Sequence, residues 1–217
     1  MSKEIYQLFK GELRGLIQGP QRRSFVTFNQ EDYFDESRKP IEPFTQFSEH
    51  YLYESRSLEI MSGSASLILL PIEGELSIQA GETNRTISPQ QILVLSPNQL
   101  IHIENCLPLE TSRFYILQFR DEPLENGIHS FHLTERNELI PLLESGVFQL
   151  NLGLYDGRKE GIQLVNEKKY LFISIINGVF EVQNRLMETN DSLLATNASE
   201  IEFEALSENA IILSLAF

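Results

Sequence analysis

The chain has 217 residues, which is long enough for one large or two small domains. Its 31 acidic and 17 basic side chains give a formal net charge of −14, and such a surface repels phosphate backbones and anionic lipid. Nucleic acid is therefore excluded as an expected partner. No apolar run reaches the roughly 18 residues needed to cross a membrane, so a membrane role is not expected either.

The expected compartment follows from the cysteine content and the first residues. Cys106 is the single cysteine, so no internal disulfide can form. The opening stretch MSKEIYQLFKGELRG is charged and interrupted by glycines, unlike a signal peptide. We expect a cytoplasmic protein.

The N-terminal residues 1–23 carry two conflicting signals. Their apolar residues fit a helical stripe, whereas Gly11, Gly15 and the Gly19-Pro20 pair oppose a continuous helix. Residues 25–28 predict a strand and residues 29–40 a polar loop. From Phe44 onward, short strands alternate with turn residues at spacings near ten, which is typical of a sandwich or barrel.

The strand pattern occurs twice. LILLPIEGE at 67–75 and LFISIINGVFE at 171–181 each read as a β-run, one glycine and a second β-run. Three further pairs follow in the same order: ILVL at 92–95 with SLLA at 192–195, IHIE at 101–104 with IEFE at 201–204, and RFYILQF at 113–119 with AIILSLAF at 210–217. A repeat of this kind predicts two copies of one all-β module.

The segment between the two copies differs in composition. Residues 121–146 have few β-branched residues, and an apolar cluster at 139–143 followed by Gly146 predicts a short helix. We therefore expect an N-terminal barrel with an N-terminal extension at 1–128, a connecting segment with a short helix at 129–146, and a C-terminal barrel at 147–217.

The repeated module resembles the cupin double-stranded β-helix, and the two-module chain resembles the pirin family of bicupins. The stretches that carry the resemblance are LILLPIEGEL at 67–76, FYILQFRDEPLENGI at 114–128 and the C-terminal run 186–217. The resemblance covers roughly residues 40–217. It implies an all-β fold of two cupin, or jelly-roll, barrels.

The resemblance also implies where a metal would bind. Pirins that act as enzymes hold an iron-type metal in the N-terminal barrel with a His-x-His pair and a later His-x-Glu pair. The first pair falls on Ile60 and Ser62, which are not normal metal ligands, and the second on His102 and Glu104. A catalytic mononuclear site usually needs about three protein ligands.

The remaining histidines are not well placed to supply a third metal ligand. His50 precedes the barrel strands, and His129 and His132 lie in the connection. The C-terminal module contains no histidine. We therefore expect no metal and no other cofactor.

The orientation of the residual pair is left open by the sequence. His102 and Glu104 share one face of a strand because they are two residues apart. They could point into the barrel as remnants of a site. Alternatively, Ile101 and Ile103 could point inward, or the pair could be buried as a hydrogen-bonded couple.

These observations favour a non-catalytic pirin-like bicupin that acts as a binding or interaction module. A small-ligand pocket in the N-terminal barrel would involve Ile60, Ser62, His102 and Glu104, and the partner would be a small molecule or a protein. The alternative is a metal-dependent dioxygenase of the quercetin-cleaving type that holds iron, or another divalent transition metal, with His102 and Glu104. A cupin-type sugar or sugar-acid isomerase would need the same metal. A monomer or a homodimer fits the sequence, which does not show whether the N-terminal segment completes the other barrel.

Overall fold

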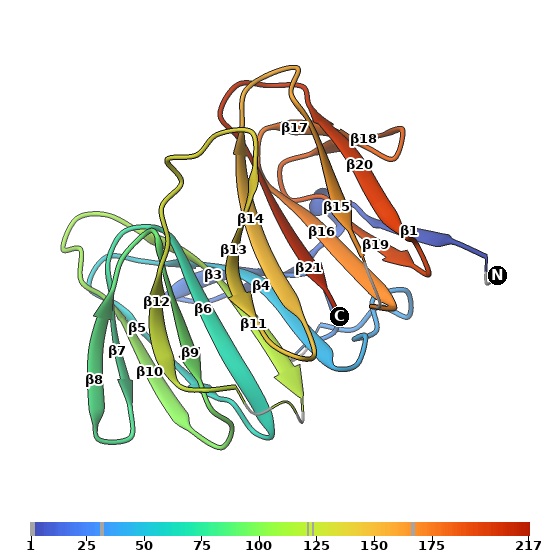
Figure 1. The fold of residues 1–217 in the computed structure, drawn as a ribbon. Coiled ribbons are helices and arrows are strands. Elements are labelled where there is room, and N and C mark those ends of the chain that lie inside the picture. The colour runs from blue at the N-terminus through green and yellow to red at the C-terminus, as the bar shows by residue number, and fades with distance from the viewer. Residues whose placement is uncertain (1–2, 31–32, 121, 123, 166–167) are drawn as a thin grey trace. The chain divides into compact units, whose positions relative to one another are not determined.

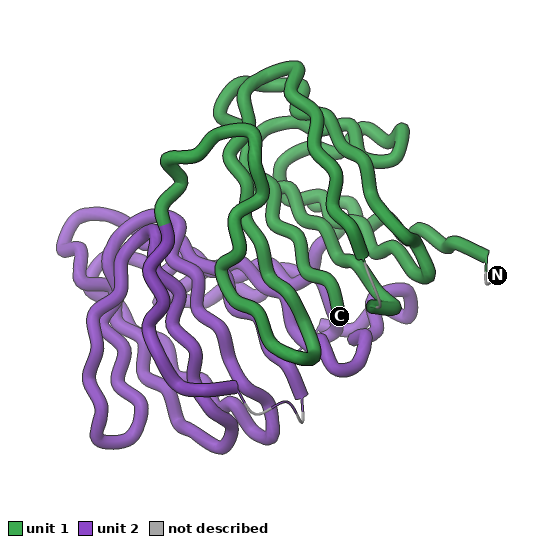
Figure 2. The backbone as a smooth tube through the Cα atoms, in the orientation of Figure 1, with its two compact units in different colours: residues 1–13, 132–217 green, residues 14–131 purple. Residues whose placement is uncertain are grey.

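A computed structural model describes the chain except for residues 1–2, 31–32, 121, 123 and 166–167. The fold is all-β, and among the described residues the helical structure is the single 3-10 turn η1 (Gly11–Leu13). No described helix has the length and apolar character needed to span a bilayer. The chain divides into two compact units, residues 14–131 and residues 1–13 together with 132–217 (Figure 2). We call them the N-terminal barrel and the C-terminal barrel.

The N-terminal barrel consists of two antiparallel sheets (Figure 1). The larger contains, in spatial order, β12 (Gly127–Ser130), β9 (Gln91–Leu95), β6 (Ala65–Glu73), β11 (Ser112–Arg120), β4 (Phe44–Leu52), β3 (Arg22–Val26) and β2 (Gly15–Gln18). The smaller contains β5 (Ser57–Met61), β10 (Leu100–Asn105), β7 (Leu76–Ala80) and β8 (Thr83–Ile87).

The C-terminal barrel repeats this arrangement. Its larger sheet runs β1 (Ile5–Phe9), β19 (Ser192–Thr196), β16 (Tyr170–Asn177), β21 (Ala210–Ala216), β14 (Gln149–Tyr155) and β13 (Leu139–Glu144). Its smaller sheet runs β15 (Glu160–Leu164), β20 (Glu200–Ala205), β17 (Val179–Val182) and β18 (Arg185–Glu188). Apart from outer strands of the larger sheets, the two orders correspond strand for strand, which confirms the repeated all-β module predicted from the sequence.

The N-terminal segment belongs to the C-terminal barrel. Strand β1 pairs antiparallel with β19, and thus takes the position that β12 takes beside β9 in the other barrel. The Asp191 carboxylate fixes the residues after β1, because it accepts hydrogen bonds from the Lys10 ammonium at 2.5 Å and the Gly11 amide at 2.8 Å. The chain therefore begins in one barrel and crosses to the other between residues 13 and 14.

The prediction of a short helix in the connecting segment is wrong. Residues 139–144 form β13, which pairs with β14 at the edge of its sheet. Pro141 explains the difference, because proline disfavours a helix interior but is accepted on an edge strand or beside a bulge. A register shift between Pro141 and Leu143 provides that irregularity and leaves Leu142 buried.

The turn glycine of each repeat sits at the same point of a hairpin. Gly74 joins β6 to β7 with φ of +83°, and Gly178 joins β16 to β17 with φ of +88°. An added Cβ would lie 2.5 Å from Ser112 Oγ at the first glycine and 2.5 Å from Ser207 Oγ at the second. Both the backbone conformation and the space therefore require glycine.

Each barrel has its own apolar core. In the N-terminal barrel, the core cluster is Leu52, Leu58, Leu67, Leu69, Leu76, Ile78, Ile87, Leu93, Leu95, Ile101, Ile103, Phe114 and Ile116. The C-terminal core includes Tyr155, Phe180 and Phe203, whose rings meet edge to face. Apolar side chains therefore form the centre of each barrel.

Candidate functional site

The predicted half site lies on strands β5 and β10, which pair antiparallel. Ile60 stands opposite Ile101, and Glu59 stands opposite His102. Ile101 and Ile103 are fully buried in the core, and Ile60 packs against the same cluster. Of the orientations that the sequence left open, the structure therefore has the isoleucines of β10 pointing inward.

His102 and Glu104 lie on the other face of the small sheet. The side chain of His102 is 38% exposed, and its Nδ1 is 3.7 Å from Oε1 of the exposed Glu59. Glu104 is exposed beside Ser57 and Ser77. The two residues of the expected pair thus stay together, but away from the barrel interior.

Ser62 forms structural hydrogen bonds with the backbone of Gln99. Its amide and hydroxyl donate to the Gln99 carbonyl at 3.1 and 3.3 Å, and its hydroxyl accepts from the Gln99 amide at 3.0 Å. The residue is buried and ties the loop after β5 to the loop before β10. The four predicted site residues are therefore not brought together around one cavity.

The donor set does not fit a catalytic metal ion. Within the part of the chain that the structure describes, no three side chains of His, Cys, Asp or Glu converge as ligands. Four inward positions of β5 and β10, Leu58, Ile60, Ile101 and Ile103, have no donor atoms. The fifth, Asn105, is occupied by bonds to the Leu52, Tyr53 and Glu110 carbonyls and to the Ser112 hydroxyl. Mononuclear catalytic sites use about three protein ligands, and His102 with Glu59 supplies two on an exposed face.

A hollow of about 410 Å³ opens beside the core of the N-terminal barrel, and we call it the barrel-mouth pocket. Its apolar wall includes the core residues Ile78, Leu93 and Leu95. Its polar lining includes Asn98, Gln99 and Asn126, and Arg85 is its charged residue. The pocket thus combines an apolar wall with a few polar groups, the usual composition of a small-molecule site.

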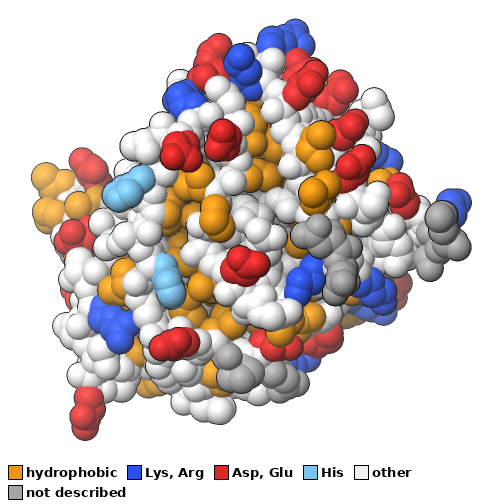
Figure 3. Space-filling model, in the orientation of Figure 1, with side chains coloured by type: hydrophobic (Ala, Val, Ile, Leu, Met, Phe, Trp, Pro, Cys, Tyr) orange, Lys and Arg blue, Asp and Glu red, His pale blue; other side chains and the backbone are white. Residues whose placement is uncertain are grey.

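Arg85 reaches the barrel-mouth pocket from β8, opposite Ile78 of β7. Its side chain is partly buried, and the described residues give it no ion pair. Acidic and basic side chains are interspersed on the face of the chain that Figure 3 shows. Arg85 therefore places a positive charge with no described carboxylate partner at the wall of the barrel-mouth pocket.

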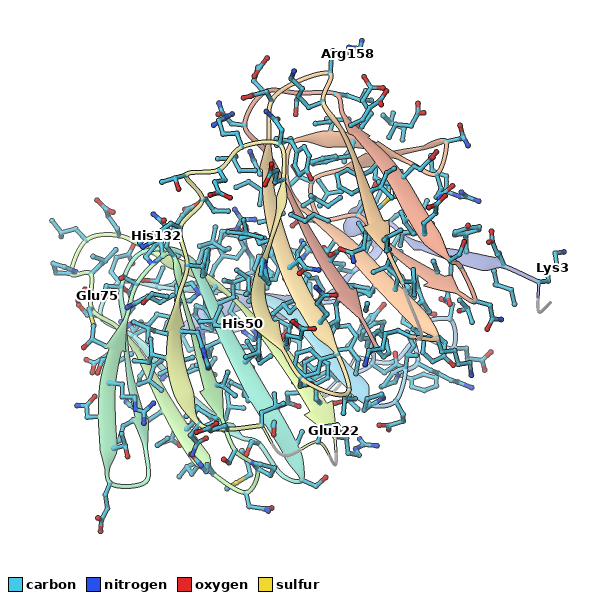
Figure 4. All side chains as sticks on the ribbon, viewed as in Figure 1. Lys3, His50, Glu75, Glu122, His132 and Arg158 are labelled. Atoms are coloured by element: carbon cyan, nitrogen blue, oxygen red, sulfur yellow. The ribbon has the colours of Figure 1, made fainter. Side chains whose placement is uncertain are left out.

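The prediction that His50 precedes the barrel strands is wrong, because the residue lies on β4. It is 1% exposed and stacks on Phe114, with ring centroids 5.2 Å apart. Its Nδ1 is 2.8 Å from Ser24 Oγ, and its Nε2 is 2.8 Å from Ser48 Oγ. Figure 4 shows His50 among the strands of the N-terminal barrel. Burial, and then the nearby Arg22 charge, lowers the pKa of His50 to about 3, so the ring is neutral.

A sequence signal for this buried polar row existed. Gln46, Ser48 and His50 alternate at spacing two, which puts their side chains on one face of a strand. Gln46 Nε2 donates to Ser48 Oγ at 2.7 Å and so extends the hydrogen-bonded row. The two other histidines offer no such network, since His129 is on the exposed β12 and His132 follows it.

The opposite face of β4 carries a buried ion-pair cluster. Glu49 Oε2 is 2.9 Å from Arg14 Nη2, and its Oε1 is 2.7 Å from Arg113 Nε. The hydroxyls of Tyr51 and Tyr115 donate to Oε1 at 3.0 and 3.2 Å. Burial raises the pKa of Glu49, but Arg14 and Arg113 more than offset it, so that the net pKa is lowered. Each carboxylate oxygen of Glu49 therefore lies within ion-pair distance of an arginine of the same barrel, and the cluster is structural.

Comparisons with known proteins agree with this architecture. Neither a protein-family model nor a curated protein matches the sequence. Among solved structures, the chain is similar to the bacterial pirin YhhW from Escherichia coli in complex with nickel(II), with a TM-score of 0.85, 12% identity, and coverage of 98% of this chain and 99% of that chain. It is also similar to quercetin 2,3-dioxygenase from Acinetobacter baumannii (TM-score 0.75, 12% identity, 97% and 78% covered) and to a cupin 2 conserved barrel domain protein from Leptotrichia buccalis (TM-score 0.58, 11% identity, 92% and 90% covered).

These likenesses define the fold class. The chain has the all-β fold of these cupin-type structures, with two jelly-roll barrels in one polypeptide, as expected from its sequence. The likeness to the bacterial pirin YhhW extends over 98% of this chain.

Proposed function

We propose that the chain is a non-catalytic, pirin-like bicupin that binds a small molecule in the barrel-mouth pocket. The observation that carries this proposal is a hollow of about 410 Å³ whose wall continues into the apolar core. The volume lies in the range of small-molecule sites. Ile78, Leu93 and Leu95 would contact the apolar body of the ligand.

Arg85 supports an anionic group on that ligand. A guanidinium is always charged in proteins and matches the geometry of a carboxylate or phosphate. Because no described carboxylate pairs with Arg85, it is available to a ligand. We therefore propose a small molecule with an apolar body and one carboxylate.

The dioxygenase alternative is not favoured by the geometry. His102 and Glu104 lie on an exposed sheet face, and the barrel interior beside them is lined by aliphatic side chains. A metal held by these two residues would lack the remaining protein ligands that enforce a catalytic geometry.

Isothermal titration calorimetry with sodium benzoate and sodium hexanoate tests the proposal. We expect at least one of these carboxylates to bind more tightly than the neutral benzamide. The Arg85→Met variant should bind it at least tenfold more weakly, whereas Arg56→Met, which removes an exposed arginine of the same barrel, should not change the affinity. Absence of binding at millimolar concentration, or equal binding by Arg85→Met, would contradict the proposal.

A further inference from the structure

A second cavity of the N-terminal barrel, of about 300 Å³, is lined by polar side chains. Gln46 and His50 from β4 and Gln118 from β11 line it together with the edge strand β5 and with Arg22 and Gln30. We call it the polar cleft. It shares no lining residue with the barrel-mouth pocket, so conclusions about one do not depend on the other.

Three glutamine amides meet at the polar cleft with unused hydrogen-bonding groups. Gln30 Oε1 is buried and has no hydrogen-bond partner. Gln46 is 6% exposed, and while its Nε2 donates to Ser48, the described residues give its Oε1 no donor. The side-chain amide of Gln118 likewise makes no hydrogen bond within the described chain.

Such groups carry a cost in the free protein. A buried polar atom without a partner costs roughly 1–3 kcal/mol, and few native structures keep one without a reason. The unpartnered oxygen of Gln30 is therefore better explained by a bound molecule than by packing.

The row behind the amides holds them in place. His50 is bonded at both ring nitrogens, to Ser24 and to Ser48, and Ser48 in turn accepts from Gln46. Every member of this row is buried. The row therefore fixes the orientation of Gln46 toward the polar cleft before any ligand arrives.

The charge balance of the polar cleft selects a neutral ligand. Arg22 and Glu59 both line it and have opposite charges, and the ring of His50 is neutral. Amide groups both donate and accept hydrogen bonds, as hydroxyl groups do. Ile60 and Met61 add an apolar surface on which the C–H face of a ring could lie.

We infer that the polar cleft binds a small neutral molecule with several hydroxyl groups, of monosaccharide or cyclitol size. The side-chain amides of Gln30, Gln46 and Gln118 would bond its hydroxyls. A cavity of about 300 Å³ is at the small end of ligand sites, which suits one ring.

Isothermal titration calorimetry with D-glucose, D-ribose and myo-inositol tests this site. We expect at least one of them to bind the full chain, and the Gln30→Met and Gln118→Met variants to bind it at least tenfold more weakly. Gln18→Met, which makes the same change on an exposed residue of β2, should bind normally. Sodium benzoate, the probe of the barrel-mouth pocket, should bind all three variants equally.

A melting curve of each free variant accompanies the titrations. Gln30→Met removes a buried oxygen without a partner, so its melting temperature should not fall, and lost binding then cannot be attributed to unfolding. Failure of all three polyols to bind at millimolar concentration would overturn the inference. So would binding that Gln30→Met and Gln118→Met leave unchanged.

Discussion

The inward orientation of the isoleucines on β10 can be tested by two neighbouring alanine substitutions. Ile101 is 0% exposed, stands between Ile60 and Ala80 of the flanking strands, and belongs to the barrel core. Ile101→Ala removes three buried carbon atoms and leaves a cavity, which typically costs about 2–5 kcal/mol. The whole side chain contributes, because core members surround it.

His102→Ala should cost far less. Its side chain is 38% exposed and that of Glu59, 3.7 Å away, is 68% exposed, so that the ion pair contributes little. We expect a change within about 0.5 kcal/mol, as for most surface substitutions. Urea unfolding followed by circular dichroism compares the two variants with the unmodified chain at pH 7. If His102→Ala destabilises the protein as much as Ile101→Ala, β10 has the inverted register and the reasoning fails.

Three further predictions concern stability. Arg113→Met leaves the buried Glu49 carboxylate with one fewer cation and should lower the free energy of unfolding by about 3–5 kcal/mol at pH 7. Because the folded pKa of Glu49 is lowered, this contribution is present above the unfolded pKa and is lost as the pH falls through the folded pKa. A variant that is as destabilised at pH 3 as at pH 7, relative to the unmodified chain, would contradict this prediction. The folded pKa of His50 is about 3, below its usual 6.5, so in acid the unfolded chain binds a proton that the folded chain does not. The free energy of unfolding should therefore fall by about 1.4 kcal/mol per pH unit below 6.5. His50→Phe should lack this slope in urea unfolding measured from pH 7 to pH 4. Gly74→Ala should lower stability by at least about 1 kcal/mol because of its positive φ and the nearby Ser112 hydroxyl, and an unchanged melting temperature would contradict this.

The repeated module was readable from the sequence because each copy keeps its turn glycine and the order of its β-runs. Gly74 and Gly178 mark the same hairpin, and the strand orders of the two barrels correspond. The partner of β1 was not readable, because pairing of residues 5–9 with 192–196 joins segments at opposite ends of the chain. Local patterns do not specify such a contact, and the glycines in residues 11–19 obscured the strand period.

The candidate site was harder to predict because a shift of one residue inverts the faces of a strand. Matching His102 and Glu104 to a ligand pattern fixed their spacing but not the side on which they lie. The buried position of His50 is not indicated by any ligand pair, but by the alternation of Gln46, Ser48 and His50 along the strand. The helix expected near Pro141 failed for a local reason, since an apolar cluster on a bulged edge strand imitates a helical stripe.

The metal content of the purified chain tests most directly the claim that its N-terminal barrel lacks a catalytic ion. Plasma mass spectrometry for iron, nickel, manganese and zinc, on protein prepared without chelator or affinity metal, should find far less than one equivalent per chain. One tightly held equivalent that is absent from the His102→Ala variant would contradict the account.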